Sequence, residues 1–191
     1  MNEIRNSVIT VIIISVLFLS GCALGVRRPF LTYTPILPPS GKNNITIKVV
    51  PFKDERKIKD TVGYVRNACG MRMAKVVPQN DVIEWVTNSL ELELKNAGYT
   101  ISEEENTPNV IEGSVFNILC DTYFTYDGRI ALKVILKKDQ KVVLENDYSV
   151  KRGGGVNLAA SSGAFAKTLE MALQETLKQV VNDINEKLLK Q

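Results

Sequence analysis

A strongly apolar run lies near the start of this chain. Ser7–Leu19 contains no charged residue and consists mainly of Val, Ile and Leu, and Arg5 precedes it. Ser20 and Gly21 follow directly. A charged start, an apolar centre and a small-residue cleavage site are the layout of a secretory signal peptide, which is removed from the mature protein. The sequence therefore predicts export, with a signal peptide over residues 1–21.

The cysteine that follows sharpens this prediction. The segment resembles the lipobox of bacterial lipoproteins, which here consists of Leu19, Ser20, Gly21 and Cys22. The match is specific because it directly follows the apolar run. The resemblance implies that the chain is cut before Cys22 and that this cysteine carries covalent lipid, palmitate included. Buried acyl chains contribute about 0.8 kcal/mol per methylene, so they can hold a protein at a membrane without a spanning helix.

An uncleaved transmembrane anchor is the alternative, because the uncharged stretch continues to Val26 and about 20 apolar residues can span a bilayer. The last third of this stretch is less hydrophobic, because it contains Ser20, Gly21 and Gly25. This favours the signal peptide over the anchor. Ala23 stands where an aspartate would resemble an inner-membrane retention signal. For a Gram-negative host we therefore expect a lipid anchor on the periplasmic side of the outer membrane, with inner-membrane anchoring as the alternative.

Prolines dominate the next stretch of the chain. Pro29, Pro35, Pro38 and Pro39 lie within residues 22–44, and proline removes a backbone donor and favours extended geometry. We expect the lipidated cysteine and this Pro-rich segment to form a semi-rigid tether. The alternative is a loop that packs on the folded domain through its apolar side chains, namely Phe30, Leu31, Tyr33 and Ile36.

Residues 45–191 show the hydrophobic periodicities of one periplasmic domain that contains both strands and helices. Ile45, Ile47 and Val49 alternate with polar residues, which predicts a first strand. Apolar residues at three- and four-residue spacing predict one helix ending at Gly98 and a second near the C-terminus. The further predicted strands are 62–66 and 73–77, joined as a hairpin, and 110–120, 129–136 and 141–150, joined as a meander. We expect an α+β fold, a mostly antiparallel β-sheet with two amphipathic helices packed on one face.

The composition excludes several classes of function. The chain is 45% hydrophobic and 24% charged, as in globular proteins, and its net charge of +3 is too small to indicate nucleic-acid binding. Histidine is absent, which removes the commonest general base and the commonest metal ligand. Gly153, Gly154 and Gly155 match no phosphate-binding pattern and are interpreted as a flexible turn. We expect no catalytic residue, no metal and no cofactor other than the covalent lipid on Cys22.

Two cysteines remain after Cys22 is assigned to lipid. Cys69 and Cys120 are separated by 51 positions, and in an oxidising periplasm such a pair can form a disulfide. A bond across so long a loop would stabilise the fold by about 3–4 kcal/mol. Buried free thiols are the alternative, and the sequence leaves both open.

One polar pair follows the first predicted strand. Asp54 and Arg56 stand two positions apart in a short polar stretch. They are interpreted as a local ion pair that holds the turn. The alternative hypothesis is a recognition edge that also includes Arg66 and Arg72.

Several of these features together resemble the YajG-like lipoproteins. The features are the lipobox, a Val-rich strand running into Asp54 and Arg56, a helix that closes on Gly98 and Tyr99, a meander and a long C-terminal helix. Members of that family look like uncharacterised, non-enzymatic lipoproteins of the outer membrane. The architecture is also similar to other small periplasmic lipoproteins that act as adaptors, including auxiliary subunits of lipid transporters.

Three classes of function follow from these observations. The leading hypothesis is an adaptor or interaction module of the cell envelope, with an envelope protein as its partner. The alternative is a binding module for an envelope lipid or glycan, such as an auxiliary lipoprotein of a lipid-transport system, which predicts a cavity of about 300 Å³ or more under the helices. An enzyme is the third class, for which no acid–base or nucleophile arrangement is present.

Overall fold

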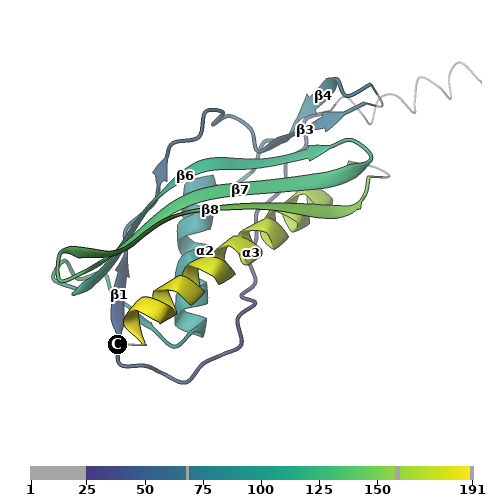
Figure 1. Ribbon diagram of the computed structural model, residues 1–191. Coiled ribbons are helices and arrows are strands. Elements are labelled where there is room, and N and C mark those ends of the chain that lie inside the picture. Colours follow the sequence, from purple (N-terminus) through teal and green to yellow (C-terminus); the bar gives the residue numbers. More distant parts are fainter. Residues whose placement is uncertain (1–24, 68, 158–159, 190–191) are drawn as a thin grey trace, which may run out of the picture.

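The computed structural model of the protein describes residues 25–67, 69–157 and 160–189. The expected signal peptide, the lipobox and Cys22 lie outside the described residues. Within them, no helix is long and apolar enough to cross a membrane. The chain forms a large curled sheet and two helices (Figure 1).

The longest strands of the sheet form the predicted meander. β6 (Asn109–Thr122) pairs antiparallel with β7 (Thr125–Lys138), and β7 pairs antiparallel with β8 (Lys141–Val156). In Figure 1 the three strands run side by side along the length of the molecule. Asp139 and Gln140, which have positive φ angles of 49° and 67°, form the tight turn between β7 and β8.

Three short strands follow one another along the opposite side of β6. β1 (Thr46–Val49), β2 (Lys53–Asp54) and β3 (Gly63–Arg66) pair with the start, the middle and the end of β6, and all three are parallel to it. β4 (Arg72–Lys75) extends the sheet beyond β3 as the antiparallel half of the predicted hairpin. β5 (Thr100–Ile101) runs parallel to β1.

The sheet is therefore mixed, and the prediction of a mostly antiparallel sheet is wrong. Hydrophobic alternation shows that a segment is a strand, but it does not show which strand lies beside it. The hairpins were predictable because a short turn forces an antiparallel neighbour. The parallel pairs join segments on opposite sides of the first helix in the sequence, and the local pattern carries no information about that pairing.

Both predicted helices are present and cover one face of the sheet. α2 (Val82–Asn96) begins at Asp81, whose carboxylate accepts hydrogen bonds from the backbone N–H groups of Ile83 and Glu84, a standard N-cap. It ends before Gly98, whose φ of +93° is the left-handed conformation predicted there. α3 (Ser162–Leu188) begins at an N-cap serine and packs mainly on β7 and β8.

The space between α3 and the sheet is filled with side chains. Apolar residues of the helix and of the strands beneath it are 0–1% exposed, and they belong to one continuous core. Burying each such side chain contributes about 1.5–3 kcal/mol. Those residues include Phe165, Leu169, Leu173 and Leu177 of α3 and Ile130, Leu132, Val134 and Leu136 of β7.

The triple glycine lies within a strand, so its interpretation as a flexible turn is wrong. β8 continues through Gly153, Gly154 and Gly155. A Cβ atom on Gly154 would overlap the side chains of Thr168 in α3 and Tyr126 in β7, whereas one on Gly155 would meet nothing. The missing side chain at Gly154 therefore allows α3 to approach the sheet closely.

Residues 27–43, called the strap below, lie across both helices. The indole N–H of Trp85 in α2 donates to the carbonyl of Thr32 at 2.9 Å, and the side-chain amide of Gln174 in α3 donates to the carbonyl of Thr34 at 2.7 Å. The backbone N–H of Asn43 donates to the carbonyl of Gly98 at 3.0 Å. Of the two alternatives for this segment, a tether and a packed loop, the packed loop is what the structure has.

Candidate functional site

Asp54 and Arg56 form a local ion pair in the turn after β2. The Nε and Nη2 groups of Arg56 donate to the two carboxylate oxygens of Asp54, each at 2.9 Å. Arg56 is only 6% exposed. Its hydrogen bonds hold the pKa of Asp54 below the ordinary value, against the opposing effect of partial burial. The pair holds the turn and offers little surface to a partner.

The other two residues of the predicted recognition edge, Arg66 and Arg72, lie elsewhere. β2 ends opposite Val115 of β6, whereas β3 begins opposite Cys120. At about 3.3 Å per residue, even the near end of β3 is about 16 Å farther along the sheet. The guanidinium of Arg72 stacks over the ring of Tyr64, 4.2 Å from its centroid. The structure thus does not bring the four residues together as one edge.

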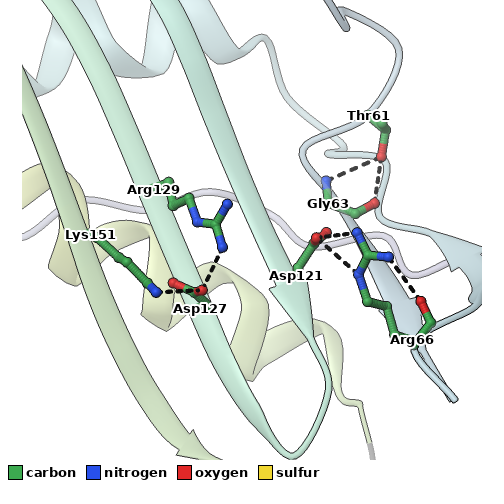
Figure 2. A network of polar contacts seen from close by, with 8 residues as sticks. Thr61, Gly63, Arg66, Asp121, Asp127, Arg129 and Lys151 are labelled. Carbon is green, nitrogen blue, oxygen red and sulfur yellow. Dashed lines mark hydrogen bonds and ion pairs between the residues drawn. The ribbon is translucent and has the colours of Figure 1, made fainter. Parts of the chain in front are cut away.

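Arg66 belongs instead to a polar network at the end of the sheet (Figure 2). Its guanidinium donates twice to Asp121 of β6, at 3.0 and 2.5 Å. On the next strand, Asp127 accepts from Arg129 at 2.7 Å and pairs with Lys151 of β8 at 3.2 Å. These contacts form two groups, one that joins β3 to β6 and one that joins β7 to β8.

The two carboxylates of this network stand directly opposite each other. Asp121 and Asp127 are cross-strand partners, and like charges in that position are destabilising. The three surrounding cations offset the repulsion. Burial raises the pKa of Asp127, but hydrogen bonds from Arg129 and Lys151 outweigh it, so the net pKa is lowered. The arrangement places two acids among three cations and holds the strands together at this end of the sheet.

Glu93 is a buried acid that was not among the predicted site residues. It lies on α2 with 0% exposure, and its carboxylate accepts from the hydroxyl of Tyr33 at 2.6 Å and from the backbone N–H of Ile36 at 2.8 Å. Burial and the acceptor Glu93 together raise the pKa of Tyr33. The sequence does contain a sign of this burial, because Glu93 directly precedes Leu94 of the predicted apolar stripe.

Both described cysteines are free thiols, so the disulfide considered above is not formed. Cys69 is exposed in the turn between β3 and β4, whereas Cys120 is buried in β6. Burial raises the pKa of the Cys120 thiol to about 12. A thiol with so high a pKa stays protonated at neutral pH and is a poor nucleophile.

β8 is an outer strand of the sheet and a long one. Among the described strands it pairs with β7 alone, and it has 16 residues. The free edge of such a strand is a template for pairing with another chain. Charged side chains follow it in order, with Lys141 at the start, Glu145 and Asp147 in the middle, and Lys151 and Arg152 near the end.

Several clefts open at the surface of the described residues. One of about 510 Å³ lies between residues 105–112 and 137–140, one of about 250 Å³ lies beside Pro51 and Gly113, and one of about 280 Å³ separates the strap from α2 near Phe30. None of the three extends between α3 and the sheet. That interface is the place where a lipid-binding module would need its cavity.

Comparisons with known proteins identify the family and the fold. The family described as "Uncharacterized lipoprotein" matches residues 38–188, and no curated protein matches. A solved structure from Xanthomonas campestris is similar over 82% of this chain and 92% of that one, with 18% identity and a TM-score of 0.57. A hypothetical protein from Chlamydia trachomatis is similar over 78% of this chain and 100% of that one, with 6% identity and a TM-score of 0.54.

At these identities the two solved structures show a shared fold and nothing about activity. The family match covers most of the chain, including both helices and the whole sheet. The chain therefore belongs to the family of uncharacterised lipoproteins, which places it among the lipid-anchored proteins of the bacterial envelope.

Proposed function

We propose that the protein is a non-enzymatic adaptor that docks an envelope protein along the free edge of β8. Lipid on Cys22 anchors it to the periplasmic face of the outer membrane. Family membership supports the lipid anchor. The resemblance to the YajG-like lipoproteins, with Ala23 after the lipobox cysteine, supports the outer membrane and the absence of catalysis.

The observation that carries this proposal is the length and openness of β8. An extended segment of a partner that adds to such an edge gains main-chain hydrogen bonds, and its alternate side chains give specificity. The acidic residues at the centre of β8, Glu145 and Asp147, are exposed. Glu145 already pairs with Lys133 of β7 at 2.5 Å. Asp147 is therefore the charge that suits a basic residue at the centre of a partner strand, and it also opposes pairing between two copies of β8 in register.

The second candidate, a module that binds a lipid in its core, finds no support in the described residues. The side chains between α3 and the sheet are buried and closely packed. The clefts described above lie at the surface and include charged residues such as Glu112 and Lys137. An acyl chain would need an enclosed apolar cavity of about 300 Å³ or more.

Photo-crosslinking in living cells tests the proposed docking edge. A photoreactive amino acid replaces Ser149, an exposed residue of β8, in the full chain. The expected result is a covalent adduct with an envelope protein, identified by mass spectrometry. Glu103, which is exposed in the loop after β5, is the matched control position and should give no adduct. Equal adducts at both positions, or none at Ser149, would contradict docking at β8.

A further inference from the structure

The strap determines how close the folded domain must lie to its anchor. Because residues 27–43 are hydrogen-bonded to both helices, they cannot act as a long spacer. The Nε group of Arg27 donates to the carbonyl of Ala160 at 2.7 Å. Only three residue steps separate Cys22 from Gly25, the first described residue, and three residues span at most about 11 Å. A lipid on Cys22 therefore keeps this part of the domain next to the membrane.

The direction of the chain shows which end of the sheet faces the anchor. Arg27 pairs in parallel with Val76, which directly follows β4. β4 begins at the β3–β4 turn. Because the two segments are parallel, the chain that leads from Arg27 back toward Cys22 runs toward the same turn. β3 is parallel to β6 and ends opposite the last residues of β6, just before the β6–β7 turn. Both turns thus lie at one end of the sheet (Figure 1).

This end, called the turn end below, carries a group of exposed apolar side chains. Two of them belong to β4 and the turn before it, two to the β6–β7 turn, one to the end of β8 and one to the start of the strap. Their exposures lie between 37 and 68%. The end of β8 is opposite Thr125, immediately after the β6–β7 turn. The six residues are Val26, Met71, Met73, Tyr123, Phe124 and Val156.

The turn end also carries a local excess of positive charge. The segments 25–28, 66–73, 121–129 and 151–157 contain seven Lys and Arg residues and two Asp residues, whereas the whole chain has a net charge of only +3. Basic residues near an anionic lipid surface contribute about 1 kcal/mol each. Aromatic side chains with a polar tip, such as Tyr123, favour the boundary between lipid and water.

We propose that the turn end is a membrane-contact surface, which seats its apolar side chains among lipid headgroups while the anchor holds the protein there. This inference rests on the lipid anchor of the proposed function. The occupant is a lipid surface because the anchor brings one within about 11 Å of this end, and because exposed apolar and basic side chains occur there together. The long strands would then rise away from the membrane, and β8 would stand accessible along its length.

Cys69 offers a reporter inside the turn end. It is exposed, whereas Cys120 is buried and its raised pKa keeps it unreactive. The full lipidated chain is labelled at Cys69 with a polarity-sensitive thiol probe and reconstituted into vesicles of phosphatidylethanolamine with a minority of phosphatidylglycerol. The expected result is a blue shift of the probe emission, loss of quenching by aqueous iodide, and gain of quenching by nitroxide-labelled phospholipid.

Two controls separate contact by the turn end from a general effect of the vesicle. The first is the double variant Cys69→Ser, Lys141→Cys, which places the probe at the far end of β8, where iodide quenching should be retained. The second compares a Met71→Ser, Phe124→Ser variant with Val142→Ser, which removes an exposed apolar side chain from the far end. Only the former should restore iodide quenching at Cys69.

The outcomes distinguish the inference from the proposed anchor. Acyl mass on Cys22 together with full iodide quenching at Cys69 would overturn the membrane contact and leave the anchor standing. A chain without acyl mass would overturn the anchor and with it this inference. Iodide exclusion without quenching by nitroxide lipid would mean that protein, such as a second copy, covers the turn end, which would also overturn lipid contact.

Discussion

Single buried polar residues attach the strap to the domain, and Glu93 is the clearest of them. Its carboxylate lies inside the apolar face of α2 and is stabilised there by donors from the strap. A buried acid without such donors would be strongly destabilising. The sequence shows a glutamate in an apolar stripe, but it does not show which segment supplies the donors, because the strap lies more than 50 positions away.

Replacing Glu93 should therefore destabilise the whole domain. Glu93→Ala leaves the hydroxyl of Tyr33 and the N–H of Ile36 without an acceptor, at about 1–3 kcal/mol for each unsatisfied group. Urea denaturation should show a loss of about 2–6 kcal/mol in the free energy of unfolding. The matched control is Glu91→Ala on the same helix, whose partner is a surface lysine 3.6 Å away. Similar losses for the two variants would contradict the role given to Glu93.

The Asp54–Arg56 pair should make stability depend on pH. The folded pKa of Asp54 is lowered from its ordinary value of 3.8. The unfolded chain therefore binds this proton first as the pH falls, so the stabilisation is present at neutral pH and is lost below about pH 4. Asp54→Asn should be less stable than the parent at pH 7, and the difference should shrink toward pH 3. A difference that is constant over this range would contradict the ion pair.

The two free thiols should differ sharply in reactivity. A thiol reagent added to the native protein should modify Cys69 within minutes and leave Cys120 untouched until denaturant is added, because Cys120 is buried and protonated. Peptide mass spectrometry before and after unfolding measures this directly. Resistance of both cysteines to the reagent until a reductant is added would instead reveal a disulfide.

At the scale of elements, local signals predicted the structure wherever the partner of a segment is adjacent in sequence. The N-cap at Asp81, the left-handed Gly98 and the β7–β8 turn are local features, and all three are present. The parallel pairing of β1, β2 and β3 with β6 is non-local and was missed. The glycines at 153–155 were misinterpreted because glycine marks a turn and a close approach alike, and only the position of α3 distinguishes the two.

Two neighbouring glycines of β8 provide a test of how closely α3 approaches the sheet. Gly154→Val forces a side chain against Thr168 and Tyr126 and should cost about 1–3 kcal/mol through overpacking. Gly155→Val places the same side chain in open space and should change the stability little, since valine suits a strand. Thermal unfolding of the two variants measures the contrast. Equal melting temperatures would contradict the packing.

At the scale of the whole molecule, the sequence indicates a lipid anchor, and the structure indicates how far the folded domain can lie from it. The lipobox is a compact motif, so it can be identified without knowledge of the fold. The strap could not be assigned in the same way, because its prolines suit a free tether and a packed loop equally. Its hydrogen bonds to α2 and α3 make the domain a body held close to its membrane, with one end of the sheet beside the anchor.

Metabolic labelling with radioactive palmitate is the direct test of the lipid anchor on Cys22. Cells expressing the full chain are compared with cells expressing Cys22→Ala. We expect label in a product shortened by the 21 residues before Cys22, and no label in the variant. An unlabelled product of full length from the parent chain would contradict the lipid anchor and everything inferred from its position.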